Sequence, residues 1–206
     1  DDYGQATGQL TPESLSNAAF PLADYPHGFS LVIEFPTMHL VWPSLTIEGA
    51  AGAEIDFSYS EHLQDDGRHL RHGHWYMAGD RFLPSRDRAT FSPTQPRGAR
   101  YIRITVRNAR DTVRIPDLRF LDCRYPVDRI GSFECSDPTL NEVWKMCERS
   151  QIANMEDVFV DCSGRERGMY LRDVIIQFHN TLAAYGDLRM MGRCMELYGQ
   201  SPDETG

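Results

Sequence analysis

The residues best equipped for chemistry in this sequence lie in one segment, from Asp161 to Asp173. It holds three carboxylates and three arginines within thirteen residues, and apolar segments frame it. Arginine orients a neighbouring carboxylate through paired hydrogen bonds, and two carboxylates on either side of a bond are the groups that hydrolyse glycosides. The segment therefore predicts acid–base chemistry on a sugar. The alternative is a cluster of structural ion pairs that ties a loop to a helix, because such networks concentrate the same residue types.

The first part of the chain that must support this segment, residues 1–125, has the pattern of short strands. Residues 99–106 alternate most clearly, with Tyr101, Ile102, Ile104 and Val106 set against two arginines and a threonine. Other candidate strands lie at 29–35, where Pro36 is expected to end the strand, and at 45–48, 53–59, 81–83, 113–115 and 118–121. Many short strands without a helical period between them predict an antiparallel β-sandwich.

From residue 126 the periodicity becomes helical. Ser136 or Asp137 is a candidate N-cap and Pro138 suits the first turn of a helix that extends to about residue 152. Further helical stretches cover 170–185 and 187–199, the latter capped by Asp187. Three amphipathic helices cannot readily bury both of their faces. We therefore expect residues 126–206 to be the start of a larger helical domain, with exposed apolar faces that favour self-association.

Composition narrows the class of protein. The 206 residues suffice for one large domain or two small ones, and 41% hydrophobic with 25% charged residues is typical of globular proteins. The formal charge of −9 argues against nucleic acid or an anionic membrane as a partner. Five cysteines without a CxxC pair do not indicate a zinc ribbon or a redox dithiol. No stretch approaches the ~20 apolar residues of a membrane span, and no cofactor fingerprint stands out.

Two other groups of residues could bind ligands. His69, His72 and His74 lie close together, but no carboxylate or cysteine completes an obvious ligand set, so an exposed polar loop is favoured and no metal is predicted. Aromatic residues that could stack on a sugar are Trp42, Trp75 and Tyr76, although core packing is the favoured interpretation.

The junction and the charged segment together resemble a known family. The residues that carry the resemblance are Tyr125-Pro126-Val127, Gly131 to Pro138, Leu140, Asn141, Trp144, Val158 to Cys162, Arg165-Glu166-Arg167 and Asp173. This pattern resembles the bacterial α-L-rhamnosidases of glycoside hydrolase family 78. The resemblance implies a mixed fold, with an antiparallel β-sandwich at 1–125 followed at 126–206 by the first helices of an (α/α)6 barrel, which is incomplete.

The same resemblance implies roles for the charged residues. Glu166 matches the general acid that protonates the glycosidic oxygen, while Asp161 and Asp173 match residues that bind sugar hydroxyls or support the acid. Arg165 and Arg167 match arginines that orient these carboxylates. Family members invert configuration, and their general base has no counterpart in this sequence. The departures from the family pattern are Ser163 for Pro, Tyr170 for Trp, which is still able to stack on a sugar, and Arg172 for Gly.

The predicted function is thus that of a fragment of an inverting α-L-rhamnosidase-like glycoside hydrolase acting on terminal rhamnosides of plant or microbial glycans. The fragment alone is expected to be inactive, without cofactor or metal. The alternatives are a non-catalytic carbohydrate-binding or structural β-sandwich module, and a diverged glycosidase for another sugar. A secreted or periplasmic location is favoured for the parent protein, with the cytoplasm as the alternative.

Overall fold

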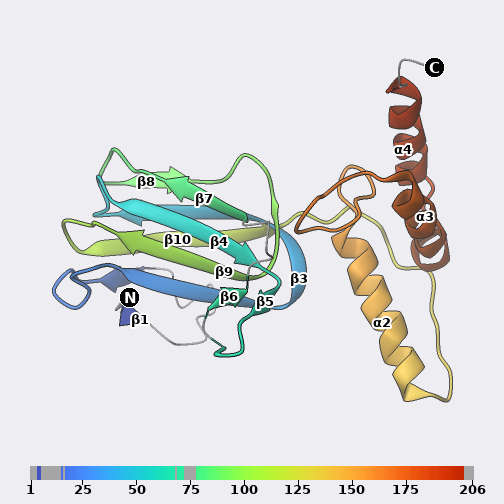
Figure 1. Ribbon diagram of the computed structural model, residues 1–206, viewed down its shortest axis with the longest axis horizontal. Helices are drawn as coiled ribbons and strands as arrows, with labels where there is room; N and C mark the ends of the chain where they lie inside the picture. Colours follow the sequence, from blue (N-terminus) through green and yellow to red (C-terminus); the bar gives the residue numbers. More distant parts are fainter. Residues whose placement is uncertain (1–3, 6–14, 16, 68, 72–77, 202–206) are drawn as a thin grey trace. The chain divides into compact units, whose positions relative to one another are not determined.

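The computed structural model describes residues 4–5, 15, 17–67, 69–71 and 78–201 (Figure 1). The chain divides into two compact units, Asp1–Asp122 and Cys123–Gly206. Strands make up the first unit and helices the second. No helix in the described ranges is both long and apolar enough to cross a membrane.

The first unit is an antiparallel β-sandwich, as the strand pattern predicts. Along the main path its strands pair in the order β2 (Ala18–Phe20), β10 (Val113–Asp122), β3 (Phe29–Glu48), β9 (Arg97–Arg107), β4 (Glu54–Ser60) and β7 (Ala78–Phe82). β1 (Gly4–Gln5) and β8 (Ala89–Phe91) also pair with β3, and β5 (His62–Leu63) pairs with β6 (Leu70–Arg71).

Strand β3 links the two layers of the sandwich. Its residues 29–34 and 39–41 pair with β9, and residues 41–48 pair with β10. The register shifts between Glu34 and His39, and Figure 1 shows the strand bending. The prediction that Pro36 ends the strand is therefore wrong. Pro36 lies within the shifted stretch, where the ladder requires no N–H donor, so β3 continues for 20 residues.

The core of the sandwich follows the predicted alternation. In β9 the side chains of Tyr101, Ile102, Ile104 and Val106 are buried, and those of the intervening polar residues are partly exposed. Gly49 has a φ of 71°, and a Cβ there would lie 2.1 Å from the carbonyl oxygen of Thr112. Only glycine fits such a turn without strain. The turn that begins at Gly49 separates β3 from β4.

The candidate histidine group and the candidate aromatic group lie partly outside the described residues. His72, His74, Trp75 and Tyr76 belong to the undescribed segment 72–77, and His69 contacts the Asp66 carboxylate. The third aromatic, Trp42, is partly buried and donates its indole N–H to the carbonyl oxygen of Pro93 at 2.6 Å. Within the described part of the chain, no three metal-ligating side chains gather into a group that could hold a metal ion.

The second unit contains α2 (Pro138–Ala153), α3 (Leu171–Tyr185) and α4 (Arg189–Gln200). The predicted N-cap of α2 is Asp137, whose carboxylate accepts a 2.8 Å hydrogen bond from the Thr139 amide. Gly186 ends α3 in the left-handed conformation. The N-cap of α4 is Leu188 and not Asp187 as predicted, although the Asp187 carboxylate accepts from the first amide of α4 at 2.8 Å. The buried core comprises Met155, Phe159, Val174, Ala184, Tyr185, Met190 and Cys194.

Candidate active site

The charged segment forms a closed loop between the end of α2 and the start of α3. Asp161 closes it, because its amide donates to the carbonyl oxygen of Gly168 at 2.9 Å and its carboxylate accepts from the Gly168 amide at 2.7 Å. Inside the loop the Glu166 amide donates to the Cys162 sulfur at 3.3 Å. Ser163 is buried at the base of the turn. These short-range bonds fix the backbone of residues 161–168, which we call the acid loop.

Glu166 lies on the exposed side of the acid loop with a partner on each oxygen. Arg165 forms an ion pair with Oε1, and the Tyr170 hydroxyl donates to Oε2 at 2.7 Å. About a third of the Glu166 side chain remains accessible (34%). The carboxyl group is therefore both held in place and open to an approaching molecule.

Tyr170 connects the acid loop to the start of α3. A Cβ on Gly168 would lie 2.7 Å from the Tyr170 ring, so the ring packs directly on the glycine backbone. The phenol is half exposed, and the hydrogen bond to Glu166, followed by the charge of that carboxylate, raises the pKa of Tyr170. Tyr170 thus presents an accessible aromatic face beside Glu166.

Arg167 makes its ion pair away from the acid loop. Its guanidinium binds both carboxylate oxygens of Glu156, with Nε 2.9 Å from Oε1, and the two side chains are only 18% and 12% exposed. The backbone of Arg167 has a φ of 52°, in the left-handed region that favours glycine. The buried pair holds this conformation and anchors the acid loop to residues 154–159.

Asp173 lies in the first turn of α3, where a carboxylate interacts favourably with the helix dipole. Burial first, and then the charges of Cys194 and Asp173, raise the pKa of Tyr198 on α4. The Tyr198 hydroxyl donates to the Met169 carbonyl at 2.7 Å. The structure brings Asp161, Arg165, Glu166 and Tyr170 together in and beside the acid loop.

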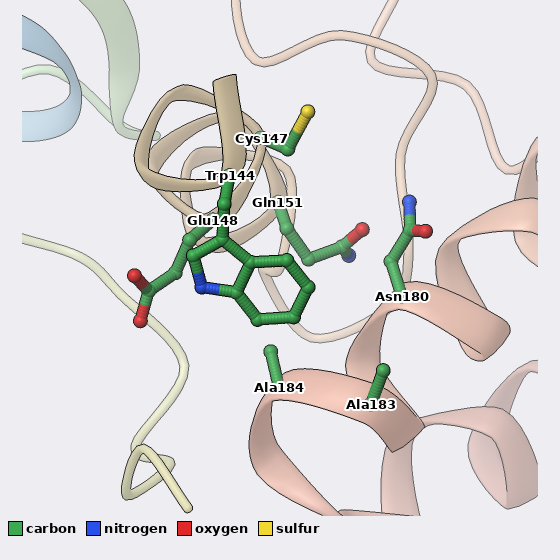
Figure 2. Close-up of a pocket in the computed structure, with 7 residues that line it drawn as sticks. All are labelled: Trp144, Cys147, Glu148, Gln151, Asn180, Ala183 and Ala184. Carbon is green, nitrogen blue, oxygen red and sulfur yellow. The ribbon is translucent and has the colours of Figure 1, made fainter. Parts of the chain in front are cut away.

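A pocket of about 70 Å³ lies between α2 and α3 (Figure 2). Its lining consists of Trp144, Cys147, Glu148 and Gln151 from α2 and Asn180, Ala183 and Ala184 from α3. None of these residues belongs to the acid loop. Figure 2 shows the Trp144 indole and the Gln151 and Asn180 amides around the space above the two alanines. The pocket is a gap between two packed helices, separate from the candidate catalytic carboxyl.

Comparisons with known proteins decide the family. Residues 27–119 match the model of the bacterial α-L-rhamnosidase concanavalin-like domain, and residues 128–206 match that of the bacterial α-L-rhamnosidase six-hairpin glycosidase domain. The chain belongs to the bacterial α-L-rhamnosidase family. The resemblance seen in the sequence is confirmed. A comparison with curated proteins returned no match.

Solved rhamnosidase structures share the fold of this family member. The GH78 family rhamnosidase of Bacillus sp. GL1 has 26% sequence identity and a TM-score of 0.74 over 81% of this chain. A rhamnosidase from Klebsiella oxytoca, solved with rhamnose bound, has 15% identity and a TM-score of 0.66 over 84% of this chain. The chain spans 17% and 36% of the lengths of these two proteins. A β-sandwich followed by the start of the helical domain is therefore confirmed.

Three residues around the acid loop were not predicted: Glu156 and Gln177, which contact it or the peptide that begins it, and Gln151, which contacts only Gln177. Glu156 gives no signal, because its partner Arg167 is eleven positions away on an irregular loop. Gln151 and Gln177 are buried and hydrogen-bonded to each other at 3.2 Å. Gln177 did leave a signal in the sequence, since it occupies the buried stripe of α3 with Val174, Thr181 and Ala184. A glutamine at such a position requires a buried partner.

Proposed function

We propose that this chain supplies the acid side of the active site of an inverting α-L-rhamnosidase, with Glu166 as the general acid. The observation that carries the proposal is the Glu166 carboxyl, fixed between Arg165 and Tyr170 yet accessible. Membership of a glycoside hydrolase family supports the reaction class. The substrates would be terminal rhamnosides of plant or microbial glycans.

In the proposed reaction, the protonated Glu166 gives its proton to the glycosidic oxygen as the bond from that oxygen to the sugar carbon breaks. A second carboxylate takes a proton from water, which attacks the same carbon from the opposite face and inverts its configuration. In inverting enzymes the two carboxyl groups are about 6.5–9.5 Å apart to admit this water. We propose that the second carboxylate lies in a longer polypeptide that contains this chain, because the chain spans only part of its relatives.

The remaining predicted site residues then have supporting roles. Tyr170 would offer its exposed ring to the apolar face of the sugar, as aromatic residues commonly do. Arg165 would hold the Glu166 carboxyl group in position through their ion pair. One carboxylate oxygen of Asp161 accepts the Gly168 hydrogen bond that closes the acid loop, so sugar binding would use the other oxygen. Arg167 would act through Glu156 by holding the loop, and Asp173 would act from the N-terminal end of α3.

The test compares Glu166→Gln with wild type in the longer polypeptide, on an alkyl rhamnoside and on a dinitrophenyl rhamnoside. General acid catalysis contributes about 10²- to 10⁴-fold, so we expect a loss of that size for the alkyl substrate and a small loss for the dinitrophenyl substrate, whose leaving group needs no proton. Glu196→Gln on the exposed side of α4 is the matched control and should leave both rates unchanged. Equal losses on both substrates would exclude Glu166 as the acid.

Two further measurements test the finer parts of the proposal. NMR of the first-formed sugar should show the anomer opposite to that of the substrate. The 206-residue chain by itself should hydrolyse neither rhamnoside. Turnover by the chain alone would show that it already contains its own base.

A further inference from the structure

A pair of buried amides links the two helices that frame the acid loop. Gln151, in the last turn of α2, is 5% exposed, and Gln177, in α3, is 8% exposed. The Gln151 side-chain amide donates to Oε1 of Gln177 at 3.2 Å, and Nε2 of Gln177 donates to the carbonyl oxygen of Val160 at 2.7 Å. Burying an amide is costly unless it is hydrogen-bonded, so both side chains are committed to these partners.

The carbonyl that Gln177 holds belongs to the peptide unit that begins the acid loop. That unit joins Val160 to Asp161, and it is planar. Gln177 binds its C=O, while its N–H donates to the carbonyl oxygen of Gly168 at 2.9 Å. The amide of Val160 is also fixed, since it donates to Asn154 at 3.1 Å. Gln177 therefore sets the orientation of the plane from which the acid loop departs.

A short series of contacts connects this peptide plane to Glu166. The Asp161 carboxylate binds the Gly168 amide at 2.7 Å, and Gly168 supports the ring of Tyr170. The Tyr170 hydroxyl then binds Glu166 at 2.7 Å. We propose that Gln177 is a positioning residue for Glu166, acting through the Val160–Asp161 peptide. The inference rests on the proposed function of Glu166 and adds a residue with no contact to the carboxyl itself.

The first test measures amide hydrogen exchange by NMR in the 206-residue chain. Gln177→Met keeps the length of the side chain and removes the donor to Val160. Gln151→Met makes the same replacement at the hydrogen-bond partner of Gln177 and leaves the Gln177 donor to Val160 in place. We expect the Asp161 and Gly168 amides to exchange about tenfold faster in Gln177→Met, the effect of losing one hydrogen bond, and less than about threefold faster in Gln151→Met.

A second variant guards against misfolding of the first. Gln177→Glu retains an oxygen that accepts from Gln151 but, when ionised, carries no hydrogen for Val160. It should accelerate the same two amides at pH values high enough to ionise the new carboxyl group. The proposal would be overturned if either Gln177 variant accelerated amide exchange equally throughout the helical unit. It would also be overturned if Gln151→Met accelerated the Asp161 and Gly168 amides as much as Gln177→Met does, because Gln177 would then act only through packing.

The second test uses the leaving-group dependence of the rate in the longer, active polypeptide. Gln177→Met should lower kcat on an alkyl rhamnoside at least about tenfold, within the range of general acid catalysis, with little change on a dinitrophenyl rhamnoside or in KM. Equal losses on both substrates would contradict positioning of the acid. Wild type without activity on any rhamnoside would refute the proposed function, and the exchange rates would still decide whether Gln177 orders the acid loop.

Discussion

At the scale of single residues, the bond between Tyr170 and Glu166 predicts an altered tyrosine titration. The hydrogen bond and then the charge of Glu166 raise the pKa of Tyr170. A raised pKa in the folded state favours the protonated phenol, so this bond stabilises the fold fully below about pH 10, the ordinary tyrosine value. The stabilisation is lost as the pH rises through the raised pKa of Tyr170.

Glu166→Gln should therefore lower the pKa of Tyr170 toward its ordinary value, because the neutral amide no longer opposes the phenolate. An NMR titration of ring-labelled tyrosine measures this shift, and Tyr170→Phe assigns the signal. Tyr185 is an internal control, since burial is the first cause that raises its pKa and Glu166 is not among the others. A Tyr170 signal that does not move would show that the two side chains are not bonded in solution.

Arg167 shows why sequence reasoning reached only part of the candidate site. The spacing of Arg165, Glu166 and Arg167 indicates two arginines flanking one carboxylate, and the ion pair of Arg165 fits that picture. Arg167 instead pairs with Glu156, because the chain turns left-handed at this residue. A left-handed turn at a non-glycine residue has no sequence signal, so the identity of a charged partner across it cannot be predicted.

At the scale of elements, the approach of residue 131 to α3 predicts a sensitive glycine. A Cβ on Gly131 would lie 2.0 Å from the carbonyl oxygen of Ala183, a backbone atom that cannot rotate away. Overpacking of this kind costs about 1–3 kcal/mol. Gly131→Ala should lower the free energy of unfolding of the helical unit by about that amount, as measured by urea denaturation followed by helical circular dichroism.

The control for this substitution lies in α4. A Cβ on Gly192 would meet nothing within 4 Å, so Gly192→Ala should raise the stability by about 0.5–1 kcal/mol through helix propensity alone. If both alanines had the same effect, the close approach at Gly131 would not describe the folded state.

The elements differ in how far the sequence could predict them. The start of α2 and the end of α3 were predictable because Asp137 and Gly186 act on neighbouring backbone. The strand through Pro36 was not, since the tolerance of that proline depends on the register between β3 and β9, which joins residues 56 to 77 positions apart. Hydrogen bonds between neighbouring residues can be predicted from the residue types alone. The strand register and the Gln151–Gln177 contact form only when distant segments meet, so they cannot be predicted in this way.

At the scale of the whole molecule, the two units differ in how completely they cover apolar side chains. The sandwich buries one continuous core. Each helix of the second unit instead leaves large apolar residues at least half exposed, among them Leu140, Met146, Leu171, Ile176 and Met195. Exposed apolar surface on this scale marks a contact surface or a site of aggregation.

We therefore expect the 206-residue chain to self-associate with increasing concentration, as measured by sedimentation velocity. Replacing Leu140 and Met146 of α2 with glutamine should weaken the association. The matched control replaces Leu83 and Leu121, which are 62% and 66% exposed on the sandwich unit, and should leave it unchanged. A chain that stays monomeric at all concentrations would contradict the prediction.

The course of strand β3 through both layers has a consequence for synthesis on the ribosome. Its antiparallel partners β8, β9 and β10 all follow it in the chain, and the last pair does not form until residue 122 has emerged. Contacts this distant in sequence form slowly. The nascent chain therefore carries a 20-residue, largely apolar strand whose pairing with β10 is completed only after more than 70 further residues are translated. Unpaired edges of this kind are prone to aggregation, so β3 is where we expect chaperones to bind during translation.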